Sequence, residues 1–123
     1  MGNIVVVDDA RFMRMMLSSI LAEEGHQTVG QGENASQAID QYQIHRPDLL
    51  TIDIVMPEVD GINSLEAIKR ILDLDRNAKI VVVSAMGQKD IIVECIQAGV
   101  KDFIVKPFQP EKIKATIQRL LSQ

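Results

Sequence analysis

Charged and hydroxyl side chains stand directly after apolar runs at four places in this sequence. They are Asp8 and Asp9 after residues 4–7, Asp53 after residues 49–52, Ser84 after residues 80–83 and Lys106 after residues 103–105. If the three carboxylates meet in one site, each pair repels by about 3 kcal/mol at a spacing of roughly 5 Å and an effective dielectric constant of about 20. Such a site needs a cation, and oxygen ligands without His or Cys favour a hard ion such as Mg²⁺.

The amine and the hydroxyl are explained by a phosphoryl group bound beside that ion. Lys106 supplies a positive point charge for one phosphoryl oxygen, and the Ser84 hydroxyl can donate a hydrogen bond to another. A metal ion and a lysine neutralise the charge of a transferring phosphoryl group while a carboxylate attacks it. The side chains together indicate Mg²⁺-dependent phosphoryl transfer to an aspartate.

The apolar runs also predict the fold that would position these residues. Five β-rich segments, residues 4–7, 27–31, 49–52, 80–83 and 103–105, alternate with amphipathic segments. Continuous apolar runs are typical of strands covered on both faces, and the polar segment 27–31 is typical of an edge strand. The alternation predicts an α/β fold with a parallel sheet and helices on both faces. The carboxyl ends of parallel strands meet at one edge, where ligands bind in such folds.

Two of the amphipathic segments carry apolar stripes at helical spacing. Phe12, Met13, Met16, Leu17, Ile20 and Leu21 form the first stripe, and Ile91, Ile92, Cys95 and Ile96 form one in residues 88–98. We expect both stripes to face the core. Val93 falls among polar positions and is expected on the surface.

Each candidate site residue also has an ordinary structural interpretation. Asp9 could cap a helix that starts at Ala10, and Asp53 could be a plain strand-end carboxylate. Ser84 could be a turn residue, and Lys106 a solvated lysine. Four separate strand ends would then carry complementary chemistry by coincidence, so their joint placement favours one shared site.

Composition narrows the class of protein. The chain has 123 residues, is 46% hydrophobic and has a formal net charge of -4, which argues against nucleic acid as a partner. No apolar run predicts a membrane span, and no signal peptide is recognisable. The single cysteine, Cys95, is typical of a protein in the reducing cytoplasm. We expect a single domain over residues 1–123.

Four sequence blocks resemble the receiver domain of bacterial two-component response regulators. The blocks are Val5-Val6-Val7-Asp8-Asp9, Asp53-Ile54-Val55-Met56-Pro57 with Asp60-Gly61, Ser84-Ala85, and Lys106-Pro107-Phe108. Their order and separation match the family over essentially the whole chain. The resemblance implies a flavodoxin-like doubly wound sheet of five strands in the order 2-1-3-4-5 with five helices, and a cis Lys106-Pro107 bond.

The resemblance also implies a role for each residue of the site. Asp53 is the expected phosphoacceptor. Asp9, Asp53 and the backbone carbonyl of Val55 are the expected ligands of Mg²⁺, with Asp8 acting through water. Lys106 is expected to bind a phosphoryl oxygen. Such a domain assists its own phosphorylation and dephosphorylation, so we do not expect a turnover enzyme.

The resemblance also implies a conformational switch, and it indicates residues that affect the lifetime of the phosphorylated form. Ser84 is expected to bind a phosphoryl oxygen and move toward it, while Phe103, an aromatic residue of the last strand, rotates inward. Phe103 could instead be a plain core residue. Val55 and Met86 occupy two positions that influence phosphoryl loss, and neither side chain can orient an attacking water strongly. We therefore hypothesise slow self-dephosphorylation.

Residues 12–17, 84–88 and 101–108 resemble the single-domain chemotaxis regulators of this family. With no DNA-binding segment after Gln123, the chain is expected to act alone, as a monomer, by docking to other proteins. The expected partners are a histidine kinase of chemotaxis type, the flagellar motor switch protein and a phosphatase. The expected docking face comprises the fourth helix, the last strand and the last helix.

Three other classes of protein share part of this pattern. A phosphorelay intermediary would have the same site and pass the phosphoryl group to a histidine phosphotransfer protein. A haloacid-dehalogenase-like phosphatase needs a D-x-D motif after the first strand, whereas Asp8 and Asp9 are adjacent. A flavodoxin needs a phosphate-binding loop rich in Ser and Thr at that point, where two aspartates would repel phosphate.

Overall fold

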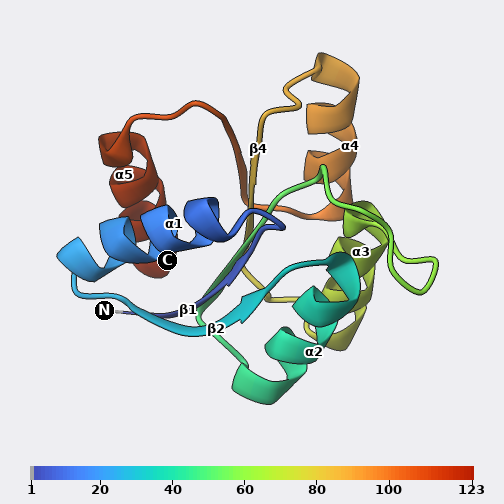
Figure 1. Cartoon of the computed structure of the whole chain (residues 1–123), viewed down its shortest axis with the longest axis horizontal. Coiled ribbons are helices and arrows are strands. Elements are labelled where there is room, and N and C mark those ends of the chain that lie inside the picture. The colour runs from blue at the N-terminus through green and yellow to red at the C-terminus, as the bar shows by residue number, and fades with distance from the viewer. Residues whose placement is uncertain (1) are drawn as a thin grey trace.

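The computed structural model describes residues 2–123, in which five strands alternate with five helices (Figure 1). In chain order they are β1 (Asn3–Val7), α1 (Arg11–Glu23), β2 (Gln27–Gly32), α2 (Ala35–His45), β3 (Leu49–Ile52), α3 (Ser64–Leu74), β4 (Ile80–Ser84), α4 (Lys89–Ala98), β5 (Asp102–Val105) and α5 (Pro110–Leu121). Every predicted strand is present, and their limits differ from the prediction by at most one residue at either end.

The strands form one parallel sheet in the order β2-β1-β3-β4-β5. The predicted flavodoxin-like fold and strand order are therefore confirmed. β1 and β3 are central neighbours, and Val7 pairs with Ile52 at their carboxyl ends. β4 and β5 end together in the same way, with Ser84 paired to Val105. The polar strand β2 lies at an edge, as its composition predicted.

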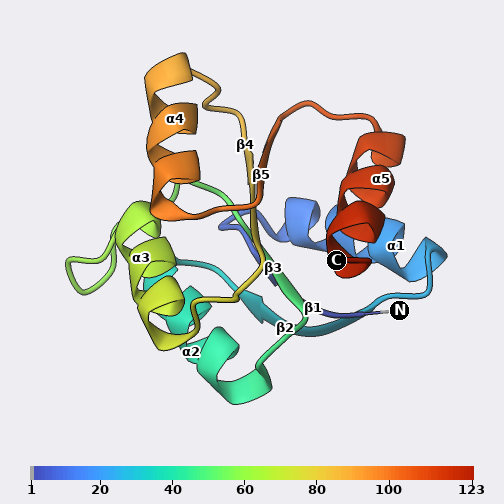
Figure 2. The same cartoon turned by 180° about the vertical axis from the view of Figure 1, so that it is seen from behind.

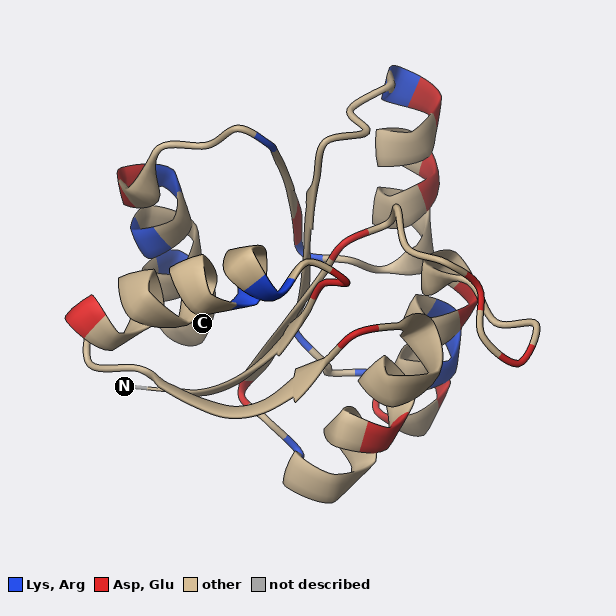
Figure 3. Ribbon diagram, viewed as in Figure 1, with Lys and Arg blue, Asp and Glu red and all other residues tan. Residues whose placement is uncertain are grey.

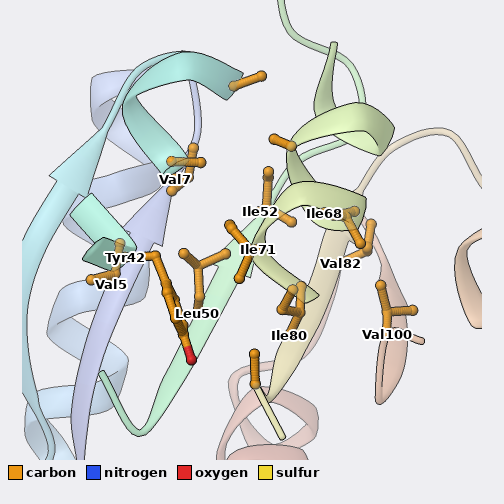
Figure 4. Packing of buried hydrophobic residues seen from close by; sticks show 14 of the residues in the cluster. Val5, Val7, Tyr42, Leu50, Ile52, Ile68, Ile71, Ile80, Val82 and Val100 are labelled. Carbon is orange, nitrogen blue, oxygen red and sulfur yellow. The ribbon is translucent and has the colours of Figure 1, made fainter. Parts of the chain in front are cut away.

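Helices cover both faces of the sheet (Figures 1 and 2). α1 and α5 pack on one face, where Leu17 and Ile117 belong to a buried cluster that includes Ile4 and Val81 of the sheet. α2, α3 and α4 lie on the other face, whose cluster includes Leu50, Ile52, Ile68 and Ile71 (Figure 4). Burying each large aliphatic side chain contributes about 2 kcal/mol. These two aliphatic layers hold the strand ends in register.

Local signals fix where the helices begin and end. The side chains of Asn34 and Asn63 cap α2 and α3 by accepting the backbone N–H groups of Gln37 and Glu66. α4 ends at Gly99, whose φ of 117° lies in the left-handed region that glycine tolerates best. The two asparagine caps lie in the loops that follow β2 and β3, at the carboxyl ends of these strands.

Two apolar residues assigned to core stripes are exposed, so those assignments are wrong. Phe12 is 72% exposed, because it lies about 140° around α1 from the buried Leu17 and Arg14 takes a place on the buried side instead. Ile96 is 47% exposed, because it lies about 100° around α4 from the buried Cys95. Val93 is exposed, as predicted.

Among residues 2–123, no helix combines the length and apolar character that crossing a membrane requires.

Cys95 is buried in the core with a free thiol, as its spacing predicted. Burial, followed by the nearby charge of Glu94, raises the pKa of that thiol. Both effects disfavour the reactive thiolate.

Candidate functional site

The carboxyl ends of β1 and β3 bring the first acidic residues together. The Asp53 N–H donates to the Val7 carbonyl at 3.2 Å, and the Asp8 N–H donates to the Gly32 carbonyl at 3.0 Å. Both hydrogen bonds continue the sheet ladder one residue past its strands. Asp8 and Asp53 are therefore held by backbone on neighbouring strands, at an edge where Figure 3 shows acidic segments gathered.

The three aspartates form one cluster. Each of Asp8, Asp9 and Asp53 has a carboxylate oxygen, and these three oxygens all lie within 4.8 Å of one another. Asp8 and Asp53 are buried, whereas Asp9 is exposed and gives access from solvent. The donors are all oxygens and carry up to three negative charges, which suits a hard divalent ion such as Mg²⁺.

Lys106 joins this cluster from the end of β5. Its ammonium Nζ lies 2.7 Å from Asp8 Oδ2 and 2.8 Å from Asp53 Oδ2. Burial alone would lower the pKa of Lys106, but the hydrogen bonds and charges of Asp53 and Asp8 outweigh it and raise the pKa overall. The amine is therefore a permanent cation at physiological pH. The Lys106-Pro107 peptide bond is cis, as predicted.

Asp53 is held at each of its polar atoms. Its Oδ1 accepts the Val55 N–H at 2.8 Å, and its Oδ2 accepts Lys106. Its backbone carbonyl accepts the buried Ser64 hydroxyl at 2.7 Å. The carboxylate is thus fixed in place before any ligand arrives, which is the preorganisation that electrostatic stabilisation requires.

Ser84 neighbours Lys106 at the carboxyl ends of β4 and β5. It is the last residue of β4 rather than the first residue after it, and its side chain is fully buried. Its carbonyl accepts the Lys106 N–H at 2.9 Å, and its hydroxyl accepts the Met86 N–H at 3.3 Å. Phe103 is partly buried and packs against the core cluster on the face covered by α3 and α4.

The structure contradicts the capping interpretation of Asp9. α1 begins at Arg11, its N-cap residue is Ala10, and no side chain of residues 2–123 caps it. Asp8 instead makes the local hydrogen bond, since its Oδ1 accepts the Ala10 N–H at 2.9 Å. The Asp9 carboxylate is left to face the other two acidic groups.

Two residues that contact the site were missed by sequence reasoning. Ser64 supports the Asp53 carbonyl, and Arg14 donates to the Asp8 carbonyl at 2.7 Å. Both residues are buried. The sequence did contain a signal that Arg14 has buried hydrogen-bond partners, because a cation among the apolar positions of α1 requires them. Ser64 gave no such signal, since a serine at the start of a helix is commonplace.

The fold and the site define a receiver module, a parallel α/β domain with an acidic cluster and a lysine at the carboxyl edge of its sheet. The chain belongs to the response regulator receiver domain family, whose model matches residues 4–118. It is therefore a component of two-component signalling.

Two relatives are chemotaxis proteins of similar length. CheY of Bacillus subtilis is 50% identical over 98% of this chain and 98% of its own length. CheY of Thermotoga maritima is 47% identical over 96% of each chain. A similar solved structure is the CheX-CheY-BeF3-Mg complex from Borrelia burgdorferi, with a TM-score of 0.86 and 30% identity over 98% of this chain and 87% of that one. These likenesses identify the chain as a CheY-like receiver.

Proposed function

We propose that this chain is a stand-alone chemotaxis response regulator that accepts a phosphoryl group from a histidine kinase onto Asp53. The observation that carries the proposal is the geometry at Asp53, whose carboxylate is hydrogen-bonded to Lys106 and lies with Asp8 and Asp9 at one rim. CheY-like relatives of nearly the same length support the chemotaxis role.

In the proposed reaction, a carboxylate oxygen of Asp53 attacks the phosphorus of a phosphohistidine. The new O–P bond forms as the P–N bond breaks, and the electron pair leaves with the imidazole nitrogen, which takes a proton from solvent. The Lys106 ammonium lies where it can shift from the Asp53 carboxylate to an oxygen of the transferred group. The ammonium would then offset part of the negative charge of the acyl phosphate as it forms.

The acidic cluster would hold the Mg²⁺ that this transfer uses. Asp9, Asp53 and the carbonyl of Val55 are the proposed ligands, with Asp8 acting through water. The bound ion would supply charge neutralisation for the phosphoryl oxygens. The crystal structure from Borrelia burgdorferi contains both Mg²⁺ and BeF3 with its CheY, which supports a metal site in this chain.

The proposed output is a change at the face made by α4, β5 and α5. Ser84 would donate its hydroxyl to a phosphoryl oxygen, and Phe103 would rotate behind it. Exposed apolar side chains, Val93, Ile96 and Val105, already lie on α4 and β5. Apolar surface of this kind suits a protein partner, for which we propose the flagellar motor switch protein.

A phosphatase is a further proposed partner, and the structure from Borrelia burgdorferi, in which CheY is in complex with CheX, supports binding of another protein by this kind of chain. We propose that the chain acts as a monomer in the cytoplasm, and that it assists its own phosphorylation and dephosphorylation without being a turnover enzyme.

The direct test is incubation with acetyl phosphate and MgCl₂, followed by intact mass measurement. We expect the wild type to gain the mass of one phosphoryl group. Asp53→Asn, or chelation of the metal, should abolish the gain. Asp60→Asn is the matched control, because it removes an exposed carboxylate from the following loop. A gain that persists in Asp53→Asn would refute Asp53 as the acceptor.

Partner choice separates the chemotaxis role from a phosphorelay. The phosphorylated chain is mixed with purified motor switch protein or with a histidine phosphotransfer domain. Phosphorylation-dependent binding to the switch protein supports chemotaxis output. Rapid loss of the phosphoryl group to the phosphotransfer domain, without binding to the switch protein, would favour the relay.

A further inference from the structure

We infer that Arg14 is a positioning residue for the acidic pair and sets the affinity of the site for Mg²⁺ through the backbone of the β1–α1 turn. This inference rests on the proposed metal site. Arg14 lies in the first turn of α1 and touches none of the three carboxylates of the cluster, according to the hydrogen bonds and ion pairs found among residues 2–123. Arg14 would therefore influence metal binding through the backbone of the β1–α1 turn, to which it is hydrogen-bonded.

The Arg14 guanidinium is buried and joins three segments. Nη1 donates to the Asp8 carbonyl at 2.7 Å, and Nε donates to the Gln31 side-chain oxygen of β2 at 3.0 Å. Nη2 lies 3.8 Å from a carboxylate oxygen of Glu33. A planar group with several fixed donors orients its acceptors more rigidly than an ammonium can. Arg14 therefore ties the acidic turn to the end of β2.

The peptide groups on both sides of Asp9 are fixed as a result. On its amino side, the Asp8 carbonyl accepts Arg14. On its carboxyl side, the Ala10 N–H donates to Asp8 Oδ1 at 2.9 Å. These two hydrogen bonds restrict the φ and ψ angles of Asp9 and so the direction of its Cα–Cβ bond.

The direction of the Asp9 side chain depends on this backbone, because no hydrogen bond or ion pair within residues 2–123 holds its carboxylate. Asp9 is exposed, and no hydrogen bond to its carboxylate is found within the part of the chain that the structure describes. Asp8 and Asp53, by contrast, are each hydrogen-bonded to Lys106 and to a backbone N–H. Asp9 is thus the member of the cluster most sensitive to loss of Arg14.

Charge and geometry predict opposite effects, which makes the inference testable. Removal of a cation beside an anionic cluster strengthens Mg²⁺ binding by Coulomb's law. Loss of the group that orients a ligand weakens metal binding, by 10-fold to 100-fold for comparable outer contacts. If Arg14 positions the acidic turn, its removal therefore raises the Kd for Mg²⁺. If Arg14 acts only as a nearby positive charge, its removal lowers that Kd.

The experiment is a titration of ¹⁵N-labelled protein with MgCl₂, following the amide signals of residues 8–14 by NMR. We expect Arg14→Met to raise the Kd for Mg²⁺ by about 10-fold, although it removes a positive charge. Arg14→Lys keeps the charge and should also raise the Kd. Gln31→Ala leaves the guanidinium in place, removes one acceptor and should have a smaller effect of the same sign.

Arg70→Met is the matched control, because Arg70 forms an exposed pair with Glu66 on α3 and its loss should leave the Kd unchanged. Far-UV circular dichroism and cooperative urea unfolding establish that each variant is folded. If Arg14→Met does not fold, Arg14→Lys and Gln31→Ala carry the test.

An unchanged or lower Kd in the folded Arg14 variants, with reduced stability, would show that Arg14 only ties α1 to β2. That result would overturn the inference and leave the proposed function intact. Absence of saturable Mg²⁺ binding to the wild type would instead remove the proposed metal site, and the inference with it.

Discussion

The Lys106 ammonium lies 2.8 Å from the Asp53 carboxylate, although 53 residues separate them in the chain. The same ammonium lies 2.7 Å from Asp8. One cation thus offsets part of the charge of two buried carboxylates, while the third, Asp9, is exposed to solvent. The three carboxylates repel one another, and either Lys106 or a bound metal ion can reduce that repulsion.

Lys106→Met should therefore destabilise the protein most when metal is absent. We expect the free energy of unfolding to fall by about 3 kcal/mol in EDTA, because removal of one partner leaves Asp8 and Asp53 buried without a counter-charge. MgCl₂ should restore more stability to this variant than to the wild type, since binding to the folded state adds stability by linkage. Urea unfolding followed by circular dichroism measures both effects.

Lys114→Met is the control for that measurement. It removes the same charge, from a pair with the exposed Glu23 carboxylate at 2.7 Å, and such pairs contribute little. Equal losses of stability in the two variants, or equal responses to MgCl₂, would contradict the central place given to Lys106.

Ser64→Ala should weaken the support of the phosphoacceptor. The buried Ser64 hydroxyl donates to the Asp53 carbonyl at 2.7 Å, and its removal leaves that carbonyl without this partner. We expect the free energy of unfolding to fall by about 1.5 kcal/mol. Asn63→Ala is a comparison in the same turn, because it removes only the cap of α3 and should cost about 1 kcal/mol. Acetyl phosphate should label Ser64→Ala more slowly and Asn63→Ala at the wild-type rate.

Val55→Asn should shorten the lifetime of the phosphorylated form. Val55 is 47% exposed, and its N–H donates directly to Asp53 Oδ1, so residue 55 adjoins the acceptor. An amide there can orient an attacking water, which the valine cannot. One hydrogen bond of about 1 kcal/mol corresponds to roughly fivefold in rate.

The decay rate is followed by intact mass after acetyl phosphate is removed on a desalting column. Val55→Thr provides a control of similar shape, with a shorter polar reach. An unchanged half-life in Val55→Asn would contradict the hypothesis that this position limits self-dephosphorylation.

Tyr42 should titrate only at strongly alkaline pH. Burial, and then its 2.7 Å hydrogen bond to Asp75, raise the pKa of Tyr42 well above the usual value of about 10. Because the folded state holds this proton more tightly, its contribution to stability is complete below about pH 10. That contribution is lost as the pH rises from there toward the folded-state pKa.

Ultraviolet absorbance of phenolate reports this titration without interference, since Tyr42 is the one tyrosine and tryptophan is absent. The chain in urea should titrate near pH 10, and the folded chain should not. Tyr42→Phe should lower stability at neutral pH by about 1 kcal/mol and lose less of it in alkali than the wild type does. A folded-state titration near pH 10 would refute the shift.

Much of the fold was predictable because its signals are local. The apolar runs of β1, β3 and β4 are buried on both faces, so their residues read as strands without help from neighbours. Phe12 and Ile96 were wrongly assigned to the core because each lies at one side of an apolar stripe. Which side of such a stripe is buried depends on the neighbouring sheet and helices. A local pattern gives a helix its period but not its rotation about its own axis.

The order of residues along the chain was enough to predict which chemical groups stand at the strand ends and, through right-handed crossovers, that they share one rim. The pairing of Lys106 with both Asp8 and Asp53, and the support of the acidic residues' backbone by Arg14 and Ser64, became visible in the folded chain alone. The difference follows from how far along the chain each interaction reaches. Strand and helix identity follow from neighbours along the chain, whereas hydrogen-bond partners depend on side-chain directions that packing sets to within an ångström.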